Sequence, residues 1–279
     1  MDRIGVPDLF LDREATQREG YSTDLFTAQA IDYLRRFTPG KPVFLFLSYN
    51  APHFPFQGPA DRDKPVEPRA KNWQEGDRAT YAAMVESMDA GIGRVLAEID
   101  RLGLRNDTLV VFTSDNGGDV HSRNAPLARG KNSMWEGGIR VPGIARWPGV
   151  IPAGTECRQV SATMDWSATF RRAAGLPADP LLEDGIDLLP MLTGGEPVSR
   201  DLFWRRVKGP VRKKVDEGRA VRSGDWKLIE MKPSDRHLYH LRNDMGETEN
   251  LIMKHPEVAR RLARKLDEWE SSLKSSSQP

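Results

Sequence analysis

The sequence has a single cysteine, no long apolar run and almost no excess of charge of either sign. One cysteine excludes a disulfide within the chain, and Cys157 lies in a polar segment without a nearby histidine, so we interpret it as structural or incidental. No apolar run is long enough to cross a bilayer. Residues 1–14 have neither the basic leader nor the hydrophobic core of a signal peptide, so we expect none here, and the sequence leaves the localisation open.

The balance of charge limits the kinds of partner. With 41 basic and 40 acidic side chains the net charge is +1, which gives no reason to expect nucleic acid or an anionic membrane. Any binding of anions must therefore depend on a local group of residues. A chain of 279 residues can bury a substantial core, and one large domain with a smaller one is the expected arrangement.

The most informative stretch is residues 108–142. Its first residues, 108–113, are apolar and β-branched and too few for a globular helix, which predicts a buried strand. Asp115 and Asn116 follow, and then two glycines. Ligands of α/β proteins bind at the carboxyl ends of strands, and these side-chain oxygens suit a hard cation, so both residues are candidate metal ligands. The same four residues also make a good tight turn, and spacing alone leaves that alternative open.

A glycine-flanked lysine, Lys131, lies downstream of this strand end. A lysine in such a loop is ordinarily solvated. Here an apolar, strand-like pattern resumes at residues 139–148, so the loop must fold back toward Asp115 and Asn116. We therefore expect Lys131 to face the site.

A second apolar run, residues 42–49, is also predicted to be a buried strand. It leads directly to His53, which has a proline on each side, and we expect these prolines to hold the backbone extended. A rigidly presented imidazole suits a ligand, although a histidine at a strand end is often only a hydrogen-bonded structural residue.

Helical periodicity appears twice before the Asp115 strand. Apolar residues at helical spacing predict one helix over residues 22–37 and a longer one over residues 81–102. A strand, a helix and a second strand in succession predict a β-α-β unit with parallel strands. His53 and Asp115 are then expected at the same edge of one sheet.

The C-terminal part has a different pattern. Beyond a glycine-rich linker at residues 194–197, four short β-rich runs are followed by an amphipathic helix, which predicts a small antiparallel sheet covered by one helix. We therefore divide the chain into residues 1–195 and 196–279. Three lysines in the turn after Val207 form a candidate basic rim, although such clusters are usually just solvated; they are Lys208, Lys213 and Lys214.

These motifs resemble the sulfatase family, the type I sulfuric ester hydrolases. The resemblance is carried by TSDNGG, NAPLARGKNSMWEGGIRVP and the Ala-Pro-His sequence that ends at His53, and it extends through residues 184–192 and the C-terminal part. It implies an α/β fold of the alkaline-phosphatase type, with a mostly parallel central sheet whose N-terminal part is missing. It also implies that Asp115 and Asn116 ligate calcium, or another divalent cation such as Mg²⁺, and that His53 and Lys131 contact the sulfate.

Two family features are absent from the chain. The family makes its nucleophile, a formylglycine, from a Cys/Ser-x-Pro-x-Arg motif that does not occur here, and the paired Asp of the family's first strand is also missing. Two ligands fall short of the six or more oxygens that calcium prefers. The resemblance therefore implies a sulfate ester hydrolase, acting on a sulfated small molecule or glycan, of which this chain alone is inactive and binds metal weakly. Many relatives are periplasmic or secreted.

Three alternatives remain open at this stage. One is a related metal-dependent hydrolase of phosphonate or phosphate esters, and another is a non-catalytic protein that binds sulfated glycans through His53, Lys131 and the basic turn. The third is a decayed fragment with exposed apolar surface and bare sheet edges. The missing N-terminal segment or a second copy of the chain is a further candidate partner.

Overall fold

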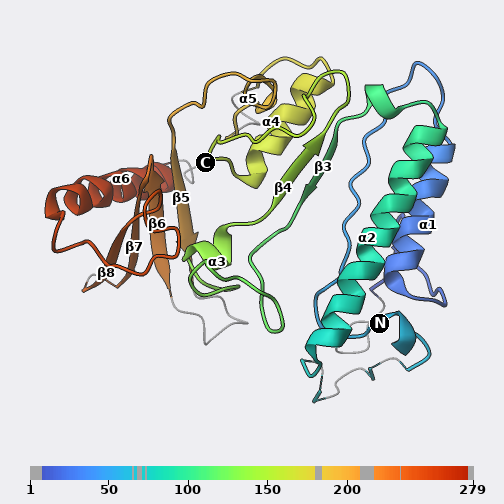
Figure 1. Cartoon of the computed structure of the whole chain (residues 1–279), viewed down its shortest axis with the longest axis horizontal. Coiled ribbons are helices and arrows are strands. Elements are labelled where there is room, and N and C mark those ends of the chain that lie inside the picture. Colours follow the sequence, from blue (N-terminus) through green and yellow to red (C-terminus); the bar gives the residue numbers. More distant parts are fainter. Residues whose placement is uncertain are drawn as a thin grey trace. The chain divides into compact units, whose positions relative to one another are not determined.

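A computed structural model describes residues 8–64, 66–67, 71–72, 74–179, 184–207, 217–232 and 234–275. The chain divides into two compact units, Met1–Thr108 and Leu109–Pro279 (Figure 1). The predicted division at residue 195 remains a prediction. The lysines of the expected basic rim, Lys208, Lys213 and Lys214, lie outside the described residues.

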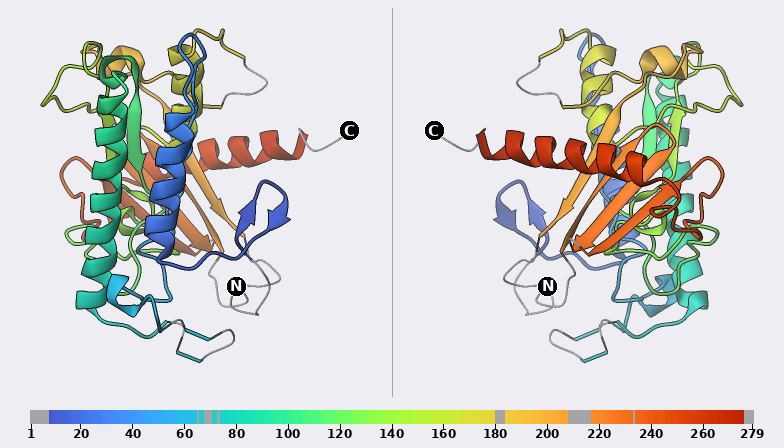
Figure 2. Two further views of the ribbon diagram at one scale, coloured as in Figure 1. Left: turned by 90° about the vertical axis from the view of Figure 1, so that its right-hand side faces the viewer. Right: turned by 90° about the vertical axis from the view of Figure 1, so that its left-hand side faces the viewer.

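The first unit is built on two long helices that pack side by side, α1 (Ser22–Arg35) and α2 (Arg78–Arg101) (Figures 1 and 2). The side chain of Asp77 caps α2 by accepting a hydrogen bond from the Thr80 amide at 2.7 Å. A glycine in α2 allows close approach, because a Cβ on Gly91 would lie 2.6 Å from Thr27 Oγ1. Both predicted helices are thus confirmed.

A buried carboxylate links the ends of the two helices. Glu98 of α2 accepts hydrogen bonds from Arg101 and from Arg35 of α1. These bonds lower the pKa of Glu98 to about 2. The unit also contains the short strands β1 (Phe10–Leu11) and β2 (Glu14–Ala15) and the single turns η1 (Pro59–Asp61) and η2 (Arg105–Asp107).

The predicted strand at residues 42–49 is wrong. The segment lies against the helix pair, with the Tyr49 hydroxyl 2.7 Å from Thr27 Oγ1, but in the described part of the chain it pairs with no strand. Alternating apolar residues favour an extended backbone, whereas a strand also needs a hydrogen-bonding neighbour. Consequently the predicted β-α-β unit is wrong too, and no parallel pair of strands occurs among the described residues.

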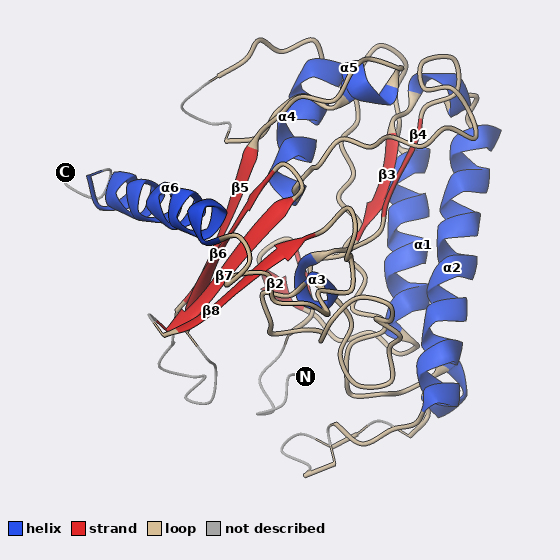
Figure 3. Cartoon of the chain, turned by 60° about the vertical axis from the view of Figure 1, so that its left-hand side comes forward, coloured by secondary structure: helices blue, strands red, loops and turns tan. Residues whose placement is uncertain are grey.

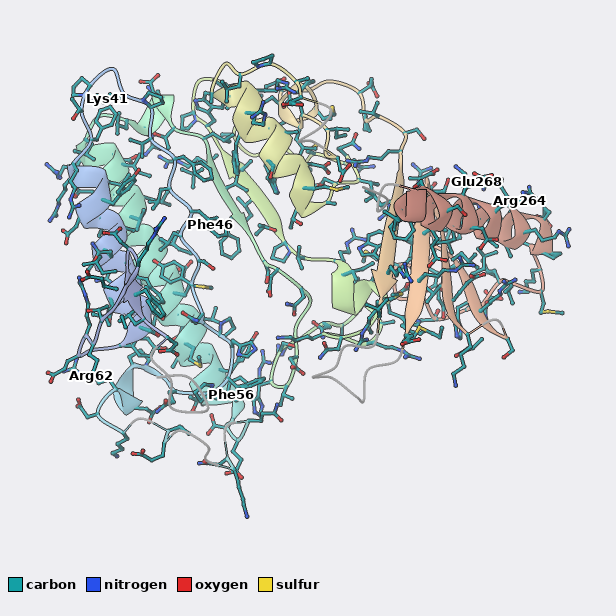
Figure 4. The ribbon with its side chains drawn as sticks, turned by 180° about the vertical axis from the view of Figure 1, so that it is seen from behind. Lys41, Phe46, Phe56, Arg62, Arg264 and Glu268 are labelled. Carbon is teal, nitrogen blue, oxygen red and sulfur yellow. The ribbon has the colours of Figure 1, made fainter. Side chains whose placement is uncertain are left out.

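The outward face of residues 42–49 is apolar and exposed. Phe44 is 66% exposed and Phe46 is 80% exposed, and the Phe46 ring points away from the helices (Figure 4). Single exposed apolar residues are common, but two neighbouring phenylalanines form an unusual patch.

Replacing both phenylalanines by serine should remove this patch without unfolding the unit. In Phe44→Ser/Phe46→Ser we expect less binding of the dye ANS and a free energy of unfolding within about 0.5 kcal/mol of the parent, because neither ring is buried. Phe56→Ser is the matched control, since Phe56 is buried and its loss should cost about 3 kcal/mol. Unchanged ANS binding in the double variant would contradict the exposure of the two phenylalanine rings.

The second unit begins with the antiparallel ribbon β3 (Val110–Thr113) and β4 (Gly143–Arg146), which is joined through α3 (Glu136–Ile139). Next come α4 (Thr163–Ala173) and α5 (Leu189–Leu192). The predicted C-terminal arrangement is confirmed, because one helix, α6 (Pro256–Ser275), packs on a four-stranded antiparallel sheet (Figure 3). Its strands are β5 (Asp201–Arg206), β6 (Gly218–Ser223), β7 (Trp226–Lys232) and β8 (Asp235–His240).

This sheet is buried on both faces. Val221 and Leu228 pack with α6, through Leu262 and Leu266. Their neighbours Ala220 and Ile229 point the other way and pack with Met134 and Trp135, which belong to the segment that follows Lys131. The sheet therefore supports the segment that carries the candidate site.

Candidate anion and metal site

Two backbone hydrogen bonds bring the lysine loop to the end of β3. The Lys131 amide donates to the Gly118 carbonyl at 2.9 Å, and the Gly117 amide donates to the Gly138 carbonyl at 3.0 Å. The loop thus returns to the strand end, as the sequence predicted. Asp115, Asn116 and Lys131 lie in this one region of the second unit, and their functional roles remain predictions.

An asparagine that the sequence pattern did not single out clamps the loop. Asn124 Nδ2 donates to the carbonyls of Gly118 at 2.8 Å and Arg129 at 3.1 Å, and its Oδ1 accepts from the Gly118 amide at 3.1 Å. The only signal in the sequence was an Asn in a polar loop, which also fits an ordinary turn.

Three residues of the same loop have a positive φ although none is a glycine. The φ values are 68° for His121, 59° for Arg129 and 69° for Asn132. Such conformations cost energy and persist where the surroundings fix them. The hydrogen bonds and close contacts of the loop provide that constraint.

The glycines of the motif let backbone pack on backbone. A Cβ on Gly117 would lie 1.8 Å from the Gly137 carbonyl oxygen, and one on Gly137 would lie 2.3 Å from the Ala128 carbonyl oxygen. No side chain fits at either distance. The paired glycines are therefore required by the approach of the two segments.

The side chains of the three candidate residues, Asp115, Asn116 and Lys131, are at least partly exposed. Asp115 is exposed, and Asn116 and Lys131 are partly exposed. None of the three side chains forms a hydrogen bond or ion pair with another described residue. The nearby Arg129 differs, because its guanidinium lies 3.4 Å from the centre of the Trp135 ring.

His53 belongs to the first unit, and its backbone differs from the prediction. The His53 amide donates to the Asn50 carbonyl at 2.8 Å, so residues 50–53 form a turn and the predicted extended backbone is wrong. The peptide bonds before Pro52 and Pro55 are both cis, which could not be predicted from the sequence Pro-His-Phe-Pro. The ring is exposed and its Nδ1 lies 2.7 Å from the Phe54 carbonyl oxygen, which orients the imidazole. Its approach to Lys131 remains a prediction.

Asp115 and Asn116 have the oxygen atoms that calcium prefers as ligands, but there are too few of them. Asp115 and Asn116 offer oxygen ligands, whereas calcium takes six to eight. In the described residues no group of three or more His, Cys, Asp or Glu side chains could hold a metal ion. The donors among the described residues therefore do not make a complete calcium site.

Comparison with known proteins identifies the family. Residues 1–176 match the profile of the family described as Sulfatase, and residues 129–272 match that of the N-sulphoglucosamine sulphohydrolase C-terminal region. The chain belongs to the sulfatase family. The resemblance drawn from the motifs is confirmed.

Curated sulfatases share about a third of their length with this chain. Steryl-sulfatase of Rattus norvegicus is 38% identical over 202 residues, which are 68% of this chain and 33% of that protein. N-acetylgalactosamine-6-sulfatase of Canis lupus familiaris is 34% identical over 197 residues, 67% of this chain and 36% of that protein. What the whole relatives do therefore enters only as a proposal for this chain.

Two solved structures support the fold. Ps i-CgsB superposes with a TM-score of 0.80 at 29% identity, over 92% of this chain and 56% of that one. A phosphonate monoester hydrolase of Agrobacterium radiobacter gives a TM-score of 0.55 at 25% identity, over 70% of this chain and 41% of that one. No helix in the described part of the sulfatase chain is long and apolar enough to span a membrane.

Proposed function

We propose that this chain is the part of a sulfuric ester hydrolase that supplies the anion-binding side chains. The observation that supports it best is the hydrogen-bonded loop that keeps Lys131 beside the end of β3, where the Asp115 and Asn116 side chains bond to no other described residue. The Lys131 ammonium and the His53 imidazole bind the non-bridging sulfate oxygens, which carry negative charge through the transition state. Asp115 and Asn116 would supply two of the ligands of a divalent cation, Ca²⁺ or Mg²⁺, and such a cation would polarise the ester when bound.

The nucleophile has to come from residues outside this sequence. No Cys/Ser-x-Pro-x-Arg occurs in the 279 residues, and the single cysteine, Cys157, is followed by Arg-Gln-Val. The purified chain is therefore inactive by itself. Metal-dependent release of sulfate from an aryl sulfate by this chain would refute that statement.

The substrate class is a sulfated glycan or a sulfated small molecule. A structure of Ps i-CgsB, 29% identical to this chain, holds k-i-k-neocarrahexaose. The curated relatives are named for a steryl sulfate and for N-acetylgalactosamine-6-sulfate. These names support the class and leave the individual substrate open.

Calcium binding by the isolated chain should be weak and should depend on Asp115. Because two oxygen donors are far from a full coordination sphere, we expect a dissociation constant of about 10⁻³ M or weaker by isothermal titration. Asp115→Asn should weaken binding further, whereas Asp119→Asn, an exposed change in the same loop, should not. Micromolar binding that survives Asp115→Asn would show that calcium binds elsewhere.

A phosphonate or phosphate ester hydrolase is the second candidate, because a phosphonate monoester hydrolase is among the structural neighbours. Side-by-side assays of aryl sulfate and aryl phosphonate, on a form joined to a sulfatase N-terminal region that carries the nucleophile motif, separate the two. Faster turnover of the phosphonate would favour the phosphonate or phosphate ester hydrolase.

A non-catalytic glycan binder is tested separately. Retention on heparin that falls with salt but persists in Asp115→Ala would favour it.

A further inference from the structure

A fully buried lysine lies on the strand that faces the site loop. Lys227 of β7 is 0% exposed, and its Nζ lies 2.8 Å from Glu136 Oε1 and 2.8 Å from Glu247 Oε1. The other oxygen of Glu247 accepts a hydrogen bond of 2.5 Å from the Glu136 amide. Three ionisable side chains thus meet out of contact with water, which is rare unless all are paired.

The charges of this group are closely balanced. Two carboxylates face one ammonium, and Arg140 Nη1 lies 3.5 Å from Glu136 Oε2, where it offsets the remaining charge. Burial raises the pKa of the Glu247 carboxyl, and the charge of Lys227 opposes that rise. Removing Lys227 leaves two buried carboxylates without the ammonium that both contact.

The group is connected directly to the candidate site. Glu136 is the first residue of α3, and the two residues after it are the glycines that pack on the Asp115 segment. Gly137 donates to the Ala128 carbonyl at 2.8 Å, and Gly138 accepts from Gly117 at 3.0 Å. Fixing Glu136 therefore fixes both sides of the loop that carries Lys131.

We propose that Lys227, Glu136 and Glu247 are positioning residues, which hold the Lys131 loop against the end of β3. The inference rests on the proposed function only in treating that loop as the anion site. The sheet does not need this group for its own packing against α6, because that face is an apolar cluster without Lys227. The group faces the site loop instead, where the Trp135 indole donates to the Tyr239 hydroxyl at 3.3 Å.

Hydrogen–deuterium exchange of the purified chain tests the proposal. In Lys227→Met, which keeps the length of the side chain and removes its charge, we expect amides of residues 128–138 to exchange at least about tenfold faster, because the two carboxylates lose their partner. Amides of α6 and β6 should keep their protection. Glu247→Gln keeps an oxygen for the Glu136 amide and should give a smaller acceleration in the same residues.

Lys265→Met is the matched control. Lys265 of α6 contacts the Asp201 carboxylate and lies 3.4 Å from Ser223 Oγ, so this change also removes an ion pair from the C-terminal sheet. It should leave residues 128–138 unchanged. The positioning role would be overturned if exchange in Lys227→Met accelerated equally in residues 128–138 and in α6, or did not accelerate at all. It would also be overturned if neither Lys227→Met nor Glu247→Gln folded.

A second readout reports on the site itself. Inorganic sulfate should slow the acetylation of Lys131 in the parent chain and in Lys265→Met, and this protection should be lost in Lys227→Met. Sulfate protection that persists in Lys227→Met would overturn the positioning role. A parent chain without any sulfate protection would contradict the proposed function and leave the exchange result to stand by itself.

Discussion

Gly117→Ala should destabilise the second unit by about 3 kcal/mol, at the upper end of the usual cost of overpacking. The added Cβ would lie 1.8 Å from the Gly137 carbonyl oxygen, and the backbone cannot rotate away as a side chain could. The two segments must separate, which also breaks the hydrogen bond from Gly117 to Gly138. Urea unfolding followed by tryptophan fluorescence measures the change, since Trp135 lies in the segment that moves.

Gly143→Ala is the control for that substitution. Gly143 is in β4 and pairs with Thr113 of the same ribbon, and a Cβ added to it would have no heavy atom within 4 Å. We expect its stability to stay the same or to rise by up to about 1 kcal/mol, because alanine restricts the unfolded chain. Equal stability of Gly117→Ala and Gly143→Ala would contradict the close packing described for the loop.

Lys131→Ala should lower kcat for an aryl sulfate by about 10²–10³ in a catalytically complete form, because it removes a charge aimed at the oxygens of the transition state. The complete form is this chain joined to a sulfatase N-terminal region that carries Cys/Ser-x-Pro-x-Arg. Release of sulfate measures the rate.

Lys254→Ala provides the comparison for that variant. Lys254 is an exposed lysine of the same unit whose ammonium pairs with Glu249, and its loss should leave kcat unchanged. An equal rate for Lys131→Ala and the parent would remove Lys131 from the site.

Local patterns predicted the C-terminal sheet and its helix well. Alternation in β6 and β7 and helical spacing in α6 each describe a face that a neighbour in the same unit covers, so sequence and structure agree. The return of the Lys131 loop could also be predicted, because the chain had to re-enter the ribbon at β4.

Other features depend on contacts that no local pattern records. Residues 42–49 have the composition of a strand, but the described chain brings no partner to their edge. Lys227 and Glu136 are separated by 91 residues, and a lysine within a strand otherwise suggests an exposed face. The role of Asn124 could not be predicted from the sequence either, because its three hydrogen bonds depend on how the loop folds.

A crystal structure of the chain grown with inorganic sulfate tests the central claim most directly. We expect one sulfate bound by Lys131 Nζ, at a hydrogen-bond distance of about 2.7–3.2 Å, beside Asp115 and Asn116. A structure in which sulfate binds away from Lys131, Asp115 and Asn116, or in which no sulfate binds, would contradict this assignment.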